Sequence, residues 1–133
     1  MSRKPLGQEV SEEAILEVAK KYFCKYGFDN TNLNDIAAEM NITRTPIYYY
    51  FESKQKLYEA VAKKHLTGKL EKYTELFASD MPFFDKVRVD LELSSHLRLA
   101  EKELFTGVDS KPALVKVKEF QTDIMHRIHK MKT

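Results

Sequence analysis

The segment from residue 32 to residue 54 most constrains the fold of this chain, because it predicts two short helices joined by a tight turn. In the first helix, apolar residues recur at offsets of three, four and seven positions, the spacing of one helix face. They are Leu33, Ile36, Ala37 and Met40. Asn32 is expected to cap the N-terminus of this helix, with Asp35 three residues further along.

The turn between the two helices is predicted at Asn41. Asn is the commonest non-glycine residue in the left-handed backbone conformation that a sharp turn after a helix requires. Ile42 supplies an apolar contact beneath this turn, and Thr43 is expected to cap the next helix. That helix is predicted from about Arg44 to Phe51. The segment as a whole is therefore a helix-turn-helix, which points to DNA.

The second helix offers a polar and aromatic face to a partner. Ile47 faces the core, but Tyr48, Tyr49 and Tyr50 cannot all do so, because successive helical residues are about 100° apart. Arg contacts guanine edges or phosphates, and Tyr hydroxyls reach phosphate oxygens. Lys54 and the backbone N–H groups around it suit a phosphate clamp. The candidate DNA-binding residues are Thr43, Arg44, Thr45, Pro46, Tyr48, Tyr49, Tyr50 and Lys54.

This stretch and the residues before it resemble a known family, and the matching positions align without a gap. They are Ala14–Ala19, Phe23, Tyr26–Phe28, Thr31, Ile36-Ala37, Ile42-Thr43, Ile47-Tyr48, Tyr50-Phe51, Ser53-Lys54 and Leu57. Over about residues 11 to 62 the chain resembles the TetR family of tetracycline-repressor-like transcriptional regulators. Asn41 stands where the family usually has Gly, and Asn32 where it often has Thr or Ser. Asn41 can still adopt the left-handed turn conformation, and Asn32 still offers a side-chain oxygen as a helix cap.

The resemblance implies an all-α fold, with a three-helix DNA-binding head followed by a partial helical-bundle regulatory domain. It implies a helix-turn-helix domain at 11–56 and an effector-binding and dimerisation domain at 57–133. The implied partners are a double-stranded DNA operator, a second copy of the chain and a small-molecule effector that releases a repressor. By the resemblance, Tyr48, Tyr50 and Lys54 contact the DNA backbone. Tyr49 matches a variable position that sometimes contacts DNA, and Arg44 and Thr45 approach base edges.

Length bears on this implied domain organisation. The chain ends at Thr133 and is shorter than TetR-like proteins usually are, so we expect a fragment with an incomplete regulatory domain. The alternative is a chain that dimerises through a different surface. Residues 1–10 are polar and contain Pro5 and Gly7, which predicts a flexible arm.

Apolar periodicity predicts four longer helices around the helix-turn-helix. They run from Ser11 to Gly27, from Ser53 to about Ala78, from Pro82 to about Phe105, and from about Lys111 to the end. The stripe of the first is expected to hold Ile15, Leu16, Ala19, Tyr22, Phe23 and Tyr26. The last repeats Leu114, Val117, Gln121, Ile124, Ile128 and Met131 at steps of three and four, which suits bundle packing or a dimer seam.

Aromatic and methionine side chains of the regulatory domain fit either its core or a small-molecule pocket, and core packing is the commoner role of such stripes. The candidate effector-binding residues are Phe77, Phe84, His96, Phe105, Phe120 and Met125. His96 and Arg98 are candidates to orient an anionic or polar ligand.

Composition narrows the setting more than the function. A hydrophobic share of 43% is ample for a core, but a net charge of +2 does not by itself indicate nucleic-acid binding. The single cysteine, Cys24, excludes an intrachain disulfide framework and favours a reducing compartment. No segment approaches the ~18 apolar residues of a membrane span. We therefore expect a cytoplasmic protein with no membrane partner.

Catalytic motifs are absent: the sequence has no nucleophile elbow, Gly-rich phosphate loop or His-Glu-x-x-His. We therefore expect no enzyme, no cofactor and no metal. Two alternatives stay open at this point. One is a helical protein interaction module that uses the exposed tyrosines and Arg44 as its binding surface. The other is a metal-dependent enzyme built around His126 and His129, with Asp123 as a further ligand.

Overall fold

The computed structural model describes residues 10–133, which form six α-helices and two short 3-10 helices and contain no β-strand. The α-helices are α1 (Glu12–Asn30), α2 (Leu33–Glu39), α3 (Thr45–Tyr50), α4 (Lys54–Ala78), α5 (Phe83–Leu104) and α6 (Val115–Lys132). The all-α prediction is therefore confirmed. All but the last residue of the predicted flexible arm lies outside the described part of the chain.

The chain divides into two compact units, Met1–Val61 and Ala62–Thr133, which we call the head and the body. Helix α4 contributes its first turns to the head and the rest to the body. The domain boundary predicted between residues 56 and 57 falls within the same helix.

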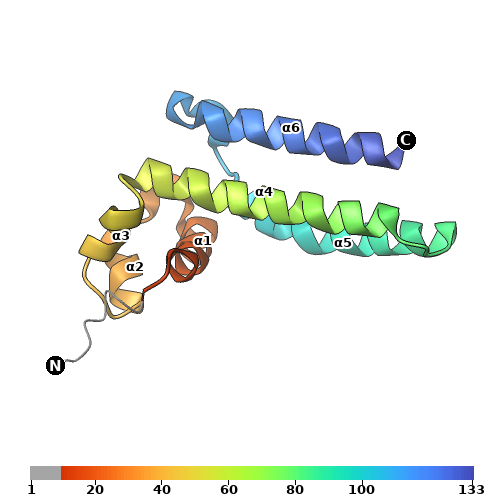
Figure 1. Cartoon of the computed structure of the whole chain (residues 1–133). Coiled ribbons are helices and arrows are strands. Elements are labelled where there is room, and N and C mark those ends of the chain that lie inside the picture. Colours follow the sequence, from red (N-terminus) through yellow and green to blue (C-terminus); the bar gives the residue numbers. More distant parts are fainter. Residues whose placement is uncertain (1–9) are drawn as a thin grey trace. The chain divides into compact units, whose positions relative to one another are not determined.

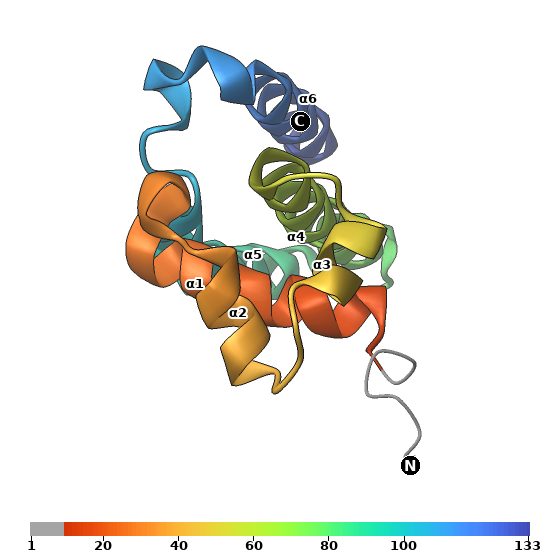
Figure 2. The same ribbon diagram turned by 90° about the vertical axis from the view of Figure 1, so that its left-hand side faces the viewer.

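The head gathers α1, α2 and α3 around the first turns of α4 (Figures 1 and 2). Helices α2 and α3 have only 7 and 6 residues, which is too short for stability in isolation. Each therefore depends on the side that it buries. The buried apolar residues of the described part of the head are Val10, Ile15, Leu16, Ala19, Phe23, Leu33, Ile36, Ala37, Ile47, Phe51, Leu57, Tyr58 and Val61. Tyr26, predicted for this core, is instead 43% exposed.

The predicted caps of α1 and α2 are confirmed. The Ser11 hydroxyl accepts a hydrogen bond from the Ala14 N–H at 3.0 Å, and the Asn32 side chain accepts one from the Asn34 N–H at 2.8 Å. Helix α1 was predicted to end at Gly27; instead Gly27 forms a kink with a φ of 81°, and the helix continues to Asn30. A positive φ suits glycine because it has no side chain to clash.

The predicted turn at Asn41 is confirmed, with a φ of 59°. Two hydrogen bonds close it: the Asn41 N–H donates to the Ala38 carbonyl at 3.1 Å, and the Ile42 N–H to the Ala37 carbonyl at 3.0 Å. This pair of bonds is a Schellman motif, which satisfies carbonyl groups left unpaired at the end of α2. The turn thus fixes the direction in which the chain leaves α2 towards α3.

The start of the second helix of the motif differs from the prediction. Helix α3 begins at Thr45, and Arg44 occupies the cap position without a side-chain bond, so the prediction that Thr43 caps this helix is wrong. Pro46 explains the difference, because it has no N–H for a cap to satisfy. The helix ends one residue earlier than expected, and the Phe51 N–H closes its last turn on the Ile47 carbonyl at 2.9 Å.

In the body, α4, α5 and α6 lie side by side (Figure 1). Leu66 and Tyr73 from α4 form a buried cluster with Ile124 and Ile128 from α6, and Leu93 of α5 packs against it. The predicted bounds of α4 and α5 are confirmed to within two residues. The last helix starts later than predicted, at Val115, because Pro112 opens a 3-10 turn that ends at Leu114.

The body also buries two polar side chains, His65 and Lys69, which both bond to the half-buried Glu101. The Glu101 carboxylate accepts a hydrogen bond from the Lys69 ammonium at 2.9 Å and lies 3.0 Å from the His65 ring nitrogen. Lys69 is only 7% exposed, so its charge needs this partner. Burial opposes ionisation of Glu101, but its bonds to His65 and Lys69 prevail and lower its pKa.

The left-handed turn predicts different effects on stability for two substitutions of Asn41. Asn41→Ala should destabilise the protein by about 1 kcal/mol, because alanine tolerates a positive φ poorly, whereas Asn41→Gly should not destabilise it. Chemical denaturation of both variants measures this. Equal losses of stability in the two variants would show that the Asn41 side chain, and not its backbone angle, matters.

The Glu101 cluster predicts a dependence of stability on acid pH. Because the folded-state pKa lies below the ordinary value of 4.5, the stabilisation is complete above that value and is lost as the pH falls through the folded-state pKa. At pH 7 the free energy of unfolding of the wild type should exceed that of Glu101→Gln by about 2 kcal/mol, and this difference should disappear at acid pH. Glu103→Gln, an exposed position on the same helix, is the control. A gap that is unchanged at low pH would contradict this assignment.

Candidate functional site

Three of the predicted DNA-binding residues line one depression in the head, of about 710 Å³, which we call the head hollow. Arg44 reaches it from the residue before α3, Tyr48 from α3 itself, and Lys54 from the first position of α4. The remaining residues that line it are Asp29, Asn30, Thr31, Asn32, Leu33, Glu52 and Ser53. The helix-turn-helix and the start of α4 thus bring a guanidinium, a phenol and an ammonium to one place.

Arg44 and Tyr48 lie against each other along α3. The guanidinium carbon of Arg44 is 5.7 Å from the centre of the Tyr48 ring, within the range of a cation–π contact. Both side chains remain exposed, and Tyr48 keeps 44% of its surface. The contact orients the guanidinium and leaves it accessible to a ligand.

Lys54 is held in place by groups at the end of α1. Its ammonium donates hydrogen bonds to the carbonyls of Asp29 at 3.2 Å and Thr31 at 3.1 Å, and lies 4.8 Å from the centre of the Phe28 ring. An ammonium has three N–H groups, so these two bonds leave one for a further acceptor. The charge is therefore fixed at the wall of the head hollow.

The other two tyrosines of α3 differ in their use. Tyr49 is 81% exposed and touches only the edge of the Tyr50 ring among the described ring contacts, with the centroids 5.0 Å apart. Tyr50 donates its hydroxyl hydrogen to the Val10 carbonyl at 3.3 Å. Thr43 and Thr45 are exposed, and Pro46 is half-buried. Of the two tyrosines, Tyr50 is thus held by the Val10 carbonyl, and Tyr49 presents its side chain to solvent.

Charge around the head hollow is balanced. Arg44 and Lys54 are offset by Asp29 and Glu52, which also line it. Binding of a phosphate there would depend on the local positions of the two cations and not on a general positive field.

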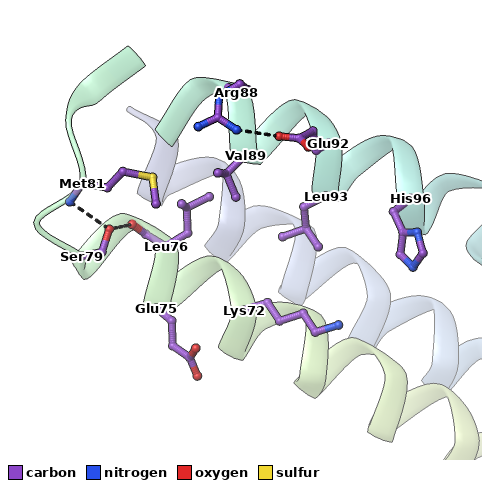
Figure 3. A pocket seen from close by; sticks show the side chains of 10 residues that line it. All are labelled: Lys72, Glu75, Leu76, Ser79, Met81, Arg88, Val89, Glu92, Leu93 and His96. Carbon is purple, nitrogen blue, oxygen red and sulfur yellow. Dashed lines mark hydrogen bonds and ion pairs between the residues drawn. The ribbon is translucent and has the colours of Figure 1, made fainter. Parts of the chain in front are cut away.

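The predicted effector residues are divided among two grooves, the core and the exposed surface of the body. The α4–α5 groove, of about 860 Å³, is shown in Figure 3 and includes His96. Leu76, Val89 and Leu93 lie between the two helices there, and Arg88 bonds to Glu92 at 3.1 Å. Its remaining lining residues are Lys72, Glu75, Ser79 and Met81.

A second groove, of about 450 Å³, lies between α4, α5 and α6, and we call it the cationic groove. Phe105 and Met125 line it. Phe77 and Phe120 instead pack against the buried cluster of the body, and Phe84 is largely exposed. The structure therefore does not bring the six predicted effector residues into one cavity. Sequence reasoning also missed Lys69, because its partner Glu101 is 32 residues away in the chain.

Residues 10–133 offer no metal-ligand cluster around the predicted histidines, because they contain no group of three His, Cys, Asp or Glu side chains that could hold a metal ion. Asp123, a proposed ligand, pairs with Arg127 at 3.2 Å. No helix in this part of the chain combines the length and the apolar character needed to cross a membrane.

Comparisons with known proteins agree with the geometry of the head. The sequence model of the family described as bacterial regulatory proteins, tetR family, matches residues 15–61. The HTH-type transcriptional regulator RutR of Escherichia coli K12 is 35% identical over 86 residues, which cover 62% of this chain and 41% of RutR. IcaR of Staphylococcus aureus strain Newman, a negative transcriptional regulator of the biofilm operon icaADBC, is 38% identical over 52 residues. That match covers 39% of this chain and 28% of IcaR.

Two solved structures share the fold. A TetR-family transcriptional regulator from Bordetella parapertussis 12822 matches 90% of this chain and 65% of its own, with a TM-score of 0.65 and 22% identity. A linker-substituted mutant of HlyIIR matches 93% of this chain and 69% of its own, with a TM-score of 0.56 and 24% identity. The chain thus spans about two fifths of RutR and about two thirds of the Bordetella protein. The family match and these relatives show that the head, over residues 15–61, is similar to the tetR family of bacterial regulatory proteins.

Proposed function

We propose that this chain is a sequence-specific DNA-binding transcriptional regulator, a repressor that a small-molecule effector releases from its operator. The observation that carries the proposal is the placement of Arg44, Tyr48 and Lys54 around one hollow beside α3. RutR and IcaR, both described as HTH-type transcriptional regulators, support it by similarity in the same region. Catalysis and cofactors have no part in this function, and we place the protein in the cytoplasm, where an operator is accessible.

In this proposal α3 enters the major groove. Residues at the N-terminal end of a recognition helix reach base edges, and here these are Arg44 and Thr45. Tyr48, one turn further along α3, and Lys54, at the start of α4, contact phosphates on the flanking backbone. The phosphate contacts fix the position of the helix, and Arg44 reads the sequence.

In this proposal the regulator acts as a homodimer on a near-palindromic operator. Two recognition helices must then lie about 34 to 36 Å apart, one turn of the DNA double helix. An effector bound in the body releases the protein if it favours a different spacing, because the two heads can no longer contact both half-sites. The body, residues 62–133, supplies the effector site in this proposal.

Arg44→Ala should weaken binding to a selected operator by about 1 to 3 kcal/mol and relax the base preference at one position, because an Arg–guanine contact is lost. Binding sites are first selected from random duplexes with the wild-type protein, and affinity is then measured by fluorescence anisotropy. Arg127→Ala, which removes an exposed guanidinium from α6, is the matched control and should bind like wild type.

Two outcomes would contradict this reading of Arg44. Equal affinities for Arg44→Ala and wild type would exclude a base contact. No salt-dependent duplex binding by a verified dimer would favour the alternative, in which the exposed tyrosines, Tyr49 above all, bind another protein.

Lys54→Met should weaken binding to all duplexes alike and reduce the slope of log affinity against log salt by about 1, because one phosphate contact is lost. It should also lower the free energy of unfolding by about 1 kcal/mol, since the ammonium holds two carbonyls of the head. Lys56→Met, at an exposed lysine that does not line the head hollow, is the control. An unchanged salt slope for Lys54→Met would show that this lysine is structural only.

A further inference from the structure

The cationic groove carries an excess of positive charge that its own residues do not neutralise. Its lining includes four cationic side chains, Lys69, Arg98, Lys102 and Lys132, against a single carboxylate, Glu101. Two of the four are paired. Lys69 binds Glu101 at 2.9 Å, and Lys132 binds Asp90 outside the lining at 3.3 Å.

The other two cations are available to a ligand. Arg98 and Lys102 are exposed, and neither forms an ion pair within the part of the chain that the structure describes. They lie four residues apart on α5, so both side chains project from the same face of the helix. Glu101 is already bonded to Lys69 and His65, which limits how far it can neutralise them.

The rest of the groove suits an apolar body of modest size. Phe105, Met125 and Ile128 contribute apolar surface, while the hydroxyls of Tyr73 and Ser94 bond to each other at 2.6 Å. A volume of about 450 Å³ falls within the range of small-molecule sites. Guanidinium and carboxylate groups form short, charge-assisted hydrogen bonds, often two at once.

The α4–α5 groove offers a contrast. Its basic residues Lys72 and Arg88 are matched by Glu75 and Glu92, and Arg88 already bonds to Glu92 (Figure 3). Its two cations are thus balanced by two carboxylates, so it lacks the net positive charge that would select for an anion.

We propose that the cationic groove binds a small organic carboxylate, with Arg98 and Lys102 holding the carboxylate and Phe105, Met125 and Ile128 contacting its apolar part. As the site of the effector, this inference rests on the proposed regulatory function. As a binding site, it is tested on the protein alone, without DNA.

The test follows the methyl groups of Met125 and Ile128 by NMR while benzoate is added to the chain. Benzoate should shift both signals to saturation, whereas benzamide, its uncharged analogue, should not. Arg98→Gln should weaken benzoate binding about tenfold or more, because a charge-assisted bond is lost. Arg88→Gln, on the same helix but in the α4–α5 groove, should bind benzoate like wild type. Unchanged thermal unfolding of Arg98→Gln excludes a folding defect.

Three results would overturn the proposal. The first is equal affinity for benzoate and benzamide, and the second is equal benzoate affinity of Arg98→Gln and wild type. The third is a loss of benzoate affinity in Arg88→Gln alone, which would place the anion in the α4–α5 groove. Duplex binding, measured separately without benzoate, tests the proposed function. Loss of duplex binding with retained benzoate binding would refute the DNA-binding role and leave the anion site standing.

Discussion

The head depends on burying one side of two helices that cannot stand alone. Helices α2 and α3 are two turns or fewer, and their apolar residues are covered by the stripe of α1 and the first turns of α4. The Schellman turn at Asn41 then fixes the angle at which α3 departs. Since α3 has no core of its own, the position of Arg44 and Tyr48 is set by this packing. The positions of the side chains that would contact DNA therefore depend on the packing of the hydrophobic core of the head.

Lys54 links that packing to the surface. Its ammonium joins the start of α4 to the carbonyls of Asp29 and Thr31, at the point where α1 gives way to α2. One side chain therefore ties the first and last elements of the head together and places a charge beside Arg44. In the body, Glu101 holds Lys69 and His65 in a similar way between α4 and α5. Both are polar groups whose partners come from segments distant in the sequence.

Local signals predicted most of the fold, and long-range contacts account for what they missed. Ser11, Asn32 and Asn41 act within a few residues of themselves, so their cap and turn roles could be read from the sequence. Thr43 failed as a cap because Pro46 removes the N–H that a cap would bind. The candidate DNA-binding residues followed from one short segment and a resemblance. The cationic groove followed only in part. Arg98, Phe105 and Met125 were candidates, but Lys69 and Lys132 join them only once α4, α5 and α6 are packed.

The most direct test of the account is an NMR titration of the full chain with a selected duplex, which maps where DNA contacts the protein. The account predicts that the largest shifts fall on residues 43–54, with Arg44, Tyr48 and Lys54 prominent, and that they weaken as salt is added. Shifts confined to the body, or spread evenly over the surface without saturation, would contradict it.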